Sequence, residues 1–157
     1  MALRYVRTIG DPVLRKKAKK VDKIDSHIIT IIDDMAETMY NADGVGLAAN
    51  QIGILRRIVV IDVGEGLLEL INPELIYEEG EQIGIEGCLS VPNTTGEVKR
   101  PKKVKVKYLD REGNIKEIEG EDLLARAFTH EIDHLNGVLF VDKALKIINE
   151  REELEVE

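Results

Sequence analysis

The sequence predicts a mixed α+β protein, and two observations support this fold class. Between residues 58 and 119, short runs rich in isoleucine, valine and leucine alternate with turn residues, a pattern typical of β-strands. On either side of this region, apolar residues recur at helical spacing instead, near residues 26–40, 120–136 and 142–150. The 157 residues are enough for one domain, 1–157, with a hydrophobic core of mainly aliphatic side chains.

The first helix is expected to follow an extended N-terminal arm. Residues 1–20 read as extended and are interrupted at Gly10-Asp11-Pro12, which is typical of a turn. Asp25 or Ser26 can cap a helix that runs to about Tyr40. The inward face of this helix is expected to carry Ile28, Ile31, Ile32, Met35 and Met39.

A glycine-rich segment, Gly44-Val45-Gly46-Leu47-Ala48-Ala49-Asn50-Gln51, follows this helix and loosely matches a dinucleotide-binding fingerprint. That fingerprint requires a strand before it and a helix after it, whereas here a helix comes first and a strand-like run comes next. We therefore reject a nucleotide site. The glycines instead indicate that backbone approaches a ligand closely, and Gln51 is a candidate for an inward-facing hydrogen-bond donor.

Five stretches in the middle of the chain carry strand signals. Four of them are apolar runs: residues 58–63, 68–71, 75–77 and 83–90. The fifth alternates Val104, Val106 and Tyr108 with lysines, as in a half-buried strand, and a turn at residues 110–114 predicts a hairpin with the return strand 115–119. Beyond residue 136 we expect a short extended run, 138–141, and a last helix, 142–150.

A helix between residues 120–122 and Asn136-Gly137 has almost no polar stripe, so it is expected to be buried on most sides. It nevertheless contains His130-Glu131-Ile132-Asp133-His134. Two histidines four residues apart share one helix face and can bind one metal ion, with Glu131 beside that ion as a general base for hydrolysis. The same pattern can also arise by chance, and the two histidines need a third ligand.

Cys88 is the only cysteine of the chain, so it has no partner for an internal disulfide. A lone cysteine in an apolar strand is more often inert filler than a chemical group. Beside a helix that carries two candidate ligands and lacks a third, this balance reverses. Two imidazoles and one thiolate would form a tetrahedral site with one position left for water, as in catalytic metal sites.

The composition is that of an ordinary globular protein, with 43% hydrophobic and 33% charged residues. The formal net charge of −8 argues against a general nucleic-acid binder, and we expect no direct nucleic-acid readout, although the charge is unevenly spread. Two basic clusters, residues 15–20 and 99–107, and an acidic end, 150–157, are typical of solvated faces, and partner binding is the lesser alternative. No apolar run reaches membrane-spanning length and the N-terminus lacks a signal-peptide core, so we expect a cytosolic protein without a membrane partner.

Three motifs together resemble the peptide deformylase family, which removes the N-formyl group from the initiator methionine of nascent bacterial and organellar polypeptides. The glycine-rich segment that ends at Gln51 resembles the first motif of that family. Glu86-Gly87-Cys88-Leu89-Ser90 matches the second motif, and His130-Glu131-Ile132-Asp133-His134 matches the third, in the same order. Shorter flanking stretches agree as well, so the resemblance spans about residues 5–143.

This resemblance implies antiparallel β-strands wrapped around a central buried helix that carries the HExxH motif, with an N-terminal helix and a short C-terminal helix. It implies that Cys88, His130 and His134 bind the metal and that Glu131 is the general base. Family members usually bind Fe²⁺ and accept Zn²⁺, Ni²⁺ or Co²⁺, so one divalent metal ion is expected.

The resemblance also assigns groups to the substrate. The side-chain amide of Gln51 and the backbone N–H of Leu89 match the donors that stabilise the oxyanion. The positions that hold the substrate backbone and its methionine side chain are matched by Val45, Gly46, Glu86, Gly87, Leu123 and Ala127. The implied partners are N-formylmethionyl nascent peptides in a bacterial cytoplasm, together with a weak ribosome association.

Two features depart from the family pattern. Thr129 stands where many members have glutamine, which puts a contact behind the metal ligands in doubt. The chain ends in a short acidic tail where some bacterial members have a longer basic helix that docks on the ribosome, and this difference puts that docking mode in doubt.

Two other functions fit parts of the pattern. An HExxH metallopeptidase would cleave peptide bonds, but it usually takes a histidine or a carboxylate as third ligand rather than a cysteine. A non-catalytic scaffold that binds a ribosome or a peptide would not need Gln51, Cys88 and Glu131 together. Metal analysis combined with a formyl-peptide assay distinguishes the three functions.

Overall fold

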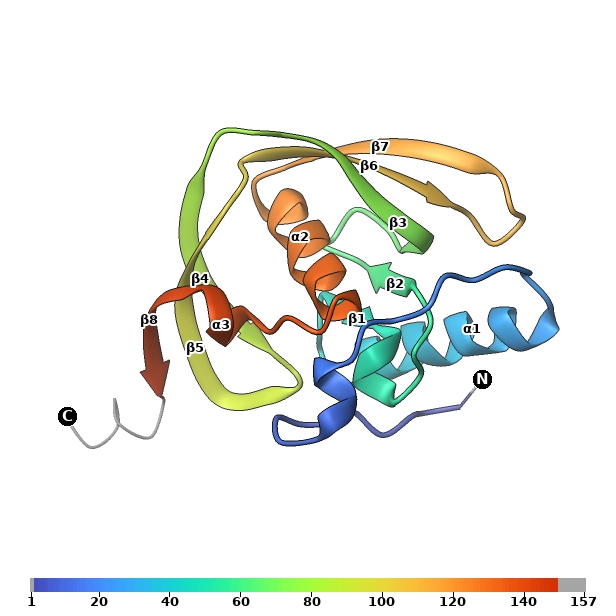
Figure 1. Cartoon of the computed structure of the whole chain (residues 1–157), viewed down its shortest axis with the longest axis horizontal. Coiled ribbons are helices and arrows are strands. Elements are labelled where there is room, and N and C mark those ends of the chain that lie inside the picture. The colour runs from blue at the N-terminus through green and yellow to red at the C-terminus, as the bar shows by residue number, and fades with distance from the viewer. Residues whose placement is uncertain (1, 150–157) are drawn as a thin grey trace.

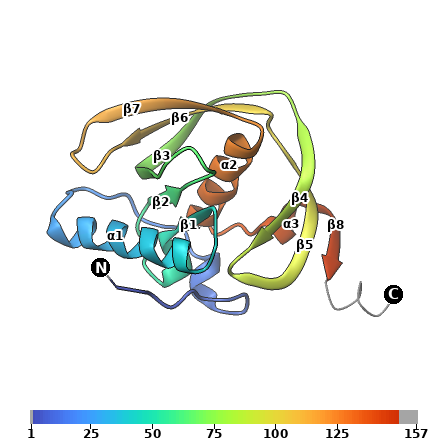
Figure 2. The same ribbon diagram turned by 180° about the vertical axis from the view of Figure 1, so that it is seen from behind.

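Two antiparallel β-sheets form the framework of the computed structural model, which describes residues 2–149 (Figures 1 and 2). The larger sheet has the strand order β1-β2-β3-β6-β7, and the smaller sheet has the order β4-β5-β8. The larger sheet comprises β1 Gly46–Ala48, β2 Ile58–Ile61, β3 Leu68–Glu79, β6 Lys103–Leu109 and β7 Ile115–Glu121. The smaller sheet comprises β4 Gln82–Cys88, β5 Val91–Arg100 and β8 Ala144–Asn149.

The helix α2, Leu123–Leu135, lies between the two sheets, with β3, β6 and β7 passing over one side and β4 and β5 over the other (Figure 1). Its apolar side chains Ala125, Phe128 and Leu135 are fully or almost fully buried, and they pack in one cluster with residues of β2, β3 and β6. Burial of a large side chain such as Phe128 contributes about 1.5–3 kcal/mol, so this packing holds the helix firmly in place. The predicted α+β architecture with a buried helix is confirmed.

The helix α1, Ser26–Asn41, packs on the outside of β1 and β2. Of the two candidate caps, Asp25 is the one used, because its side chain accepts a hydrogen bond from the backbone N–H of Ile28 at 3.0 Å. The five apolar residues predicted for the inward face are all buried. Neither α1 nor α2, the long helices among residues 2–149, is long and apolar enough to cross a membrane.

The strand β3 joins two runs that the sequence separates. Residues 68–71 and 75–77 form one strand with an irregular register between Ile71 and Glu74, where Asn72-Pro73 interrupts the ladder. Asn72 has a φ of +53°. Its side chain bonds both the N–H and the C=O of Val21, so it ties the N-terminal segment to the sheet. The strand therefore continues through this irregular segment, and the segment holds the N-terminal part of the chain against the sheet.

The predicted last helix at residues 142–150 is wrong within the described part of the chain. A short helix α3, Phe140–Lys143, is followed by β8, which pairs with β5 from Val98 opposite Ala144 to Thr94 opposite Asn149. The backbone hydrogen bonds offered by the open edge of β5 outweigh the helical spacing of these residues. The extended run predicted for 138–141 is wrong from Phe140 onward, because α3 begins there.

The strand β5 has no counterpart in the sequence prediction. Its residues include Pro92, Asn93 and Gly96, which normally interrupt a strand. A tertiary contact explains Gly96. A Cβ on Gly96 would lie 3.0 Å from the carbonyl oxygen of Lys146, so only glycine lets β8 approach this closely.

Gly137, after the end of α2, provides a test of the packing between this helix and the N-terminal segment. Its φ is +77°, and a Cβ there would lie 2.5 Å from the carbonyl oxygen of Arg15. We expect Gly137→Ala to lower the free energy of unfolding by about 2 kcal/mol or more, through strain and the backbone clash, in urea denaturation. Gly64→Ala, at φ +105° with no atom within 4 Å of the added Cβ, measures the strain alone. An equal loss in both variants would contradict the clash.

Candidate metal centre

The helix α2 presents His130, Glu131 and His134 at the buried centre of the molecule. Their exposed fractions are 8%, 4% and 1%. Because His130 and His134 are four residues apart, their rings stand one turn apart, with centroids 5.0 Å from each other. Such polar groups are costly to bury unless they are bonded, so the site has to satisfy them internally.

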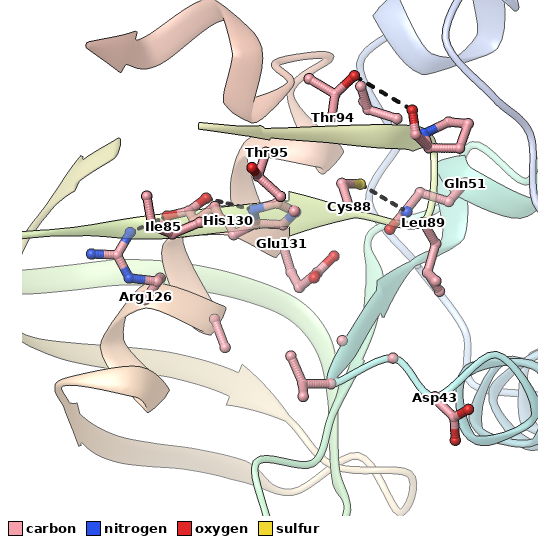
Figure 3. Close-up of a pocket in the computed structure, with 18 of the residues that line it drawn as sticks. Asp43, Gln51, Ile85, Cys88, Leu89, Thr94, Thr95, Arg126, His130 and Glu131 are labelled. Carbon is pink, nitrogen blue, oxygen red and sulfur yellow. Dashed lines mark hydrogen bonds and ion pairs between the residues drawn. The ribbon is translucent and has the colours of Figure 1, made fainter. Parts of the chain in front are cut away.

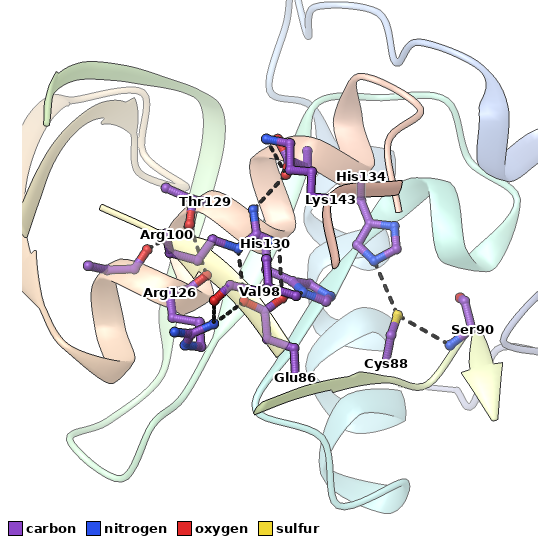
Figure 4. Close-up of polar contacts among 12 residues, drawn as sticks. Glu86, Cys88, Ser90, Val98, Arg100, Arg126, Thr129, His130, His134 and Lys143 are labelled. Carbon is purple, nitrogen blue, oxygen red and sulfur yellow. Dashed lines mark hydrogen bonds and ion pairs between the residues drawn. The ribbon is translucent and has the colours of Figure 1, made fainter. Parts of the chain in front are cut away.

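Cys88 ends β4 and brings the third candidate ligand to these histidines. One ligand atom from each of Cys88, His130 and His134 lies within 4.8 Å of the others, and Cys88 Sγ is 3.2 Å from His134 Nε2 (Figure 4). A thiolate and two imidazoles are donors that zinc and other transition metals accept, and three protein ligands are typical of catalytic sites. The three residues that the sequence assigns to a metal are therefore brought together, although 42 positions separate Cys88 from His130 along the chain.

Two observations show that this group fits a cation. The buried Glu131 Oε1 has no hydrogen-bond partner among the described residues, so the site holds an oxygen that the protein alone does not satisfy. Burial also lowers the pKa of His134 well below its ordinary value, and the positive charges of His130 and Arg100 lower it further. A neutral imidazole is the form that ligates a metal, and His134 has this form. Among protein groups alone His130 differs, because burial lowers its pKa but hydrogen bonds to Cys88 and Glu86 raise it to about 10, so metal binding would have to release that proton.

Glu86, on β4, holds His130 in place from behind. Glu86 Oε1 accepts a hydrogen bond from His130 Nδ1 at 2.8 Å, which leaves the other ring nitrogen of His130 for a metal. Arg100 binds the same carboxylate at 2.8 and 2.9 Å, and Arg126 also binds it (Figure 4). Burial alone would raise the pKa of Glu86, but Arg100 and His130 lower it well below its usual range. Glu86 is therefore ionised, and its carboxylate is surrounded by Arg100, Arg126 and His130.

We expect Glu86→Gln to weaken metal binding about 10–100-fold, because it removes the carboxylate that orients His130. The same change leaves the buried cation of Arg126 without its anion and leaves Arg100 with Asp133 alone, which lowers the free energy of unfolding by about 3–5 kcal/mol. Metal competition titration and urea denaturation measure the two effects. Glu81→Gln is the matched control, because among the described residues Glu81 forms only an exposed ion pair, with Lys99, and its loss should change stability by less than about 1 kcal/mol. Unchanged metal affinity in Glu86→Gln would contradict the orienting contact.

Gln51 also contacts the sulfur of Cys88. Its Nε2 is 3.5 Å from Cys88 Sγ and donates to Ser90 Oγ at 3.0 Å, while its Oε1 accepts a bond from the N–H of Ala48 at 3.0 Å. These bonds fix the side-chain amide, and Gln51 is only 1% exposed. The side chain of Gln51 therefore faces inward, as the sequence predicts. Its role as a donor to the substrate stays a prediction.

A pocket of about 410 Å³ opens onto these residues (Figure 3). All six predicted substrate-contact residues line it, as do Gln51, Leu89 and Glu131. The six are Val45, Gly46, Glu86, Gly87, Leu123 and Ala127. Glu86 differs from the other five, because its carboxylate already bonds Arg100, Arg126 and His130.

The backbone of Gly46, in the wall of the pocket, lies against the carboxylate of the candidate base Glu131. A Cβ at this position would lie 2.5 Å from Glu131 Oε2, so glycine is required for the observed contact. Burial raises the pKa of the Glu131 carboxyl to about 7, and the charges of His130 and Arg100 oppose that shift. Among protein groups alone, Glu131 is thus able to exchange a proton near neutral pH.

Sequence reasoning missed the residues behind the metal ligands. Arg100 belongs to a basic cluster that we expected to be solvated, yet it is 3% exposed and also binds Asp133 at 2.6 Å. Its alternation with the exposed Lys99 in β5 is the one signal that could have identified it. Arg126 was missed as well.

The side chain of Thr129, which stands just before the HExxH motif, forms no hydrogen bond with the metal ligands, all of which lie in the described part of the chain. Among the described residues, its hydroxyl donates only to the carbonyls of Ala125 and Arg126 in its own helix.

The fold and the site together define a class, that of metal-dependent hydrolases, because two members of the Cys/His/His group, Cys88 and His130, line one pocket with the buried Glu131. Residues 3–150 match the polypeptide deformylase family. The chain belongs to this family, whose members are metal-dependent enzymes that remove the N-formyl group from nascent polypeptides.

Known relatives agree over almost the whole chain. A peptide deformylase of Thermoanaerobacter pseudethanolicus is 76% identical over 156 residues, which is 99% of this chain and 98% of that protein. One from Caldanaerobacter subterraneus is 77% identical over 155 residues, 99% of this chain and 97% of that protein. The crystal structure of the Thermotoga maritima peptide deformylase superimposes with a TM-score of 0.90 at 48% identity, over 92% of this chain and 99% of that one.

Proposed function

We propose that this chain releases formate from N-formylmethionyl nascent peptides with one divalent metal ion held by Cys88, His130 and His134. The observation that carries the proposal is the meeting of these three ligand atoms, within 4.8 Å of one another, next to a pocket that Cys88, His130 and Glu131 line. When bound, the ion polarises the formyl group and makes a water molecule more acidic. The remaining steps belong to side chains and backbone groups of the chain.

Glu131 acts as general base and then as general acid. It accepts a proton from the water that attacks the formyl carbon, and it delivers that proton to the amine nitrogen as the C–N bond breaks. The products are formate and a peptide with a free amino terminus. The contact with Gly46 and the burial of Glu131 support this role, because they fix the carboxylate at the pocket wall.

Gln51 and Leu89 stabilise the negative charge that develops on the formyl oxygen. The amide of Gln51 is held in place by Ser90 and Ala48, so it needs no reorganisation during the reaction. Donors of this kind are worth about 2.7–4 kcal/mol each in the transition state. The N–H of Leu89 would supply the second donor, since Leu89 follows Cys88 in the pocket wall.

The substrate peptide is positioned by the remaining residues of the pocket. Val45, Gly46 and Gly87 would hold its backbone, and Leu123 and Ala127 would contact the methionine side chain. Glu86 would act on the substrate only indirectly, because its carboxylate is used to orient His130. We place the activity in a single domain, 1–157, in the bacterial cytoplasm where nascent chains emerge, with a weak ribosome association.

The metal is proposed to be Fe²⁺ first, by the family relation, with Zn²⁺, Ni²⁺ and Co²⁺ as alternatives that suit the same donors. The test is anaerobic purification, metal analysis and an assay of formate release from a formyl-Met peptide. One metal ion per chain and formate release are expected. Cleavage of the Met–peptide bond in place of the formyl bond would instead support a metallopeptidase. If the chain catalyses neither reaction, the non-catalytic scaffold is the remaining function.

A further inference from the structure

The wall of the pocket contains a cation whose hydrogen-bonding capacity the protein uses only in part. Arg126, on α2, lines the pocket, and its side chain is only 10% exposed. Among the described residues, only Nη1 of its guanidinium group forms hydrogen bonds, to Glu86 and to the carbonyl of Val98 at 3.2 Å. Among the same residues, Nη2 is buried without a partner. An unpaired buried donor is costly, so an acceptor on a ligand would be stabilised here.

The guanidinium group is held in a fixed position and its charge is balanced. A Cβ at Gly84 of β4 would lie 2.8 Å from Nη2 of Arg126, so glycine lets the group lie directly against this strand. Two carboxylates, Glu86 and Asp133, oppose the two buried arginines of this network. A further anion beside Arg126 would be repelled by Glu86. The free donor therefore fits a neutral acceptor.

Arg126 lies where the first side chain of a substrate peptide is expected. Four residues of α2 that are spaced three or four apart share one face of the helix, and all of them line the pocket (Figure 3). They are Leu123, Arg126, Ala127 and His130. The helix rises about 6 Å between His130 and Arg126, a length that an extended methionine side chain spans. The end of that side chain is therefore expected near the free N–H groups.

The required ligand group is a neutral oxygen on a side chain of methionine shape. Leu123 and Ala127 offer apolar contacts to its methylene groups, while Arg126 offers N–H groups. The thioether sulfur of methionine is only a weak acceptor, so it makes little use of this donor. Methionine sulfoxide has the same carbon chain and carries one polar oxygen on the sulfur. That oxygen can accept the hydrogen bond that Arg126 leaves free.

We propose that Arg126 lets this chain deformylate peptides whose N-formylmethionine is oxidised to the sulfoxide. This activity rests on the proposed function and adds a second class of substrate to the same site. Water hydrolyses the formyl C–N bond as in the unoxidised peptide, and the sulfoxide itself is not changed. A wholly apolar pocket would exclude the sulfoxide, because its oxygen would lose its bonds to water and gain none. A fixed donor also distinguishes the two epimers at sulfur, since it lies on one side of the side chain.

The test measures kcat/KM on the metal-loaded native chain for peptides that differ only in the first residue. These residues are formyl-Met, formyl-norleucine and each epimer of formyl-Met sulfoxide. One epimer is expected within about tenfold of formyl-Met, and the other at least about tenfold below the first, the effect of one hydrogen bond to a charged group. Equal rates for the two epimers, or rates for both about a hundredfold below that of formyl-norleucine, would overturn the proposal.

Arg126→Lys removes the free donor and keeps a cation next to Glu86. One ammonium nitrogen replaces three guanidinium nitrogens and is attracted to the carboxylate, so the pocket loses its N–H groups. The value of kcat/KM for the favoured epimer, divided by that for formyl-Met, should fall roughly ten- to a hundred-fold. This quotient cancels any effect on metal binding or on the chemical step, because both substrates share them.

Arg100→Lys is the matched control. Arg100 is the other buried arginine that binds Glu86, but it is not among the residues that line the pocket. The quotient should therefore stay nearly unchanged in this variant. An equal fall in both variants would show that the effect comes from Glu86, and it would overturn the role of Arg126.

Affinity for the same peptides is measured by isothermal titration calorimetry on Glu131→Gln, which is expected to bind substrate with little turnover. The favoured epimer should bind more weakly to the double variant Glu131→Gln, Arg126→Lys, whereas the affinity for formyl-norleucine should change little. If the native chain releases formate but treats the two epimers alike, only the role of Arg126 fails. If the affinities show the preference but the native chain releases no formate, the proposed function fails and Arg126 remains a binding residue.

Discussion

Glu131→Gln is expected to retain the metal ion and to lose nearly all turnover of a formyl-Met peptide. The amide has almost the same shape as the carboxylate but cannot accept a proton from water, and general-base catalysis of this kind contributes about 10²–10⁴-fold. The metal ligands stay intact, because Glu131 is separate from the group formed by Cys88, His130 and His134. Steady-state formate release and metal analysis on the same preparation measure both quantities.

Glu74→Gln is the control for this change, because Glu74 is an exposed carboxylate on β3 outside the pocket. It should leave both turnover and metal content unaltered. If the turnover of Glu131→Gln is within about tenfold of that of the native enzyme, Glu131 does not transfer the proton. Loss of the metal in Glu131→Gln would instead mean that Glu131 is a ligand, which conflicts with the geometry of the site.

Cys88→Ser should abolish tight metal binding. Serine preserves the size of the side chain, but a neutral hydroxyl is a far poorer ligand than a thiolate for Fe²⁺ or Zn²⁺, and we expect a loss of affinity beyond the roughly 10–100-fold that outer contacts contribute. Turnover should fall with metal content. Dialysis against a chelator of known affinity, followed by metal analysis, gives the size of the effect.

A thiol titration provides the control for Cys88, because it is the only cysteine in the chain. In the native protein, the metal-loaded form should resist alkylation and the chelator-treated form should react with one equivalent of reagent. Unchanged metal affinity in Cys88→Ser, or equal alkylation of the two native forms, would show that the sulfur does not bind the ion.

The parts of the site that lie on one element were predictable from the sequence. His130, Glu131 and His134 share a helix, and helical periodicity alone places them on adjacent turns of a buried face. Cys88 is different, because nothing local brings a strand residue to that helix. Its assignment depended on its being the one cysteine and on the resemblance of three separated motifs to a family.

The residues that support the site were not predictable in the same way. Arg100 lies in a lysine-rich run, and the run's composition concealed the alternation that turns Arg100 inward and Lys99 outward. Arg126 sits on a helix whose apolar pattern suggested uniform burial, and its charge is explained only by Glu86 on another element. Local spacing cannot reveal an ion pair that the tertiary fold creates.

The same reason accounts for the errors at the C-terminal side of the fold. Residues 144–149 have apolar spacing compatible with a helix, but they form β8 because β5 offers an open edge. That edge was itself hidden, since β5 contains Pro92 and Gly96. Because β5 was not predicted, its pairing with residues 144–149 could not be predicted either, and a helix was expected there.

The most direct test of the metal centre is X-ray absorption spectroscopy of the protein purified without oxygen. If Cys88, His130 and His134 share one ion, the spectrum should contain one sulfur and two imidazole nitrogens in the first coordination shell, at about 2.3 Å and about 2.0–2.1 Å for zinc. The Cys88→Ser variant should lose the sulfur scatterer. A bound metal whose shell contains no sulfur in the native protein would contradict the proposed site.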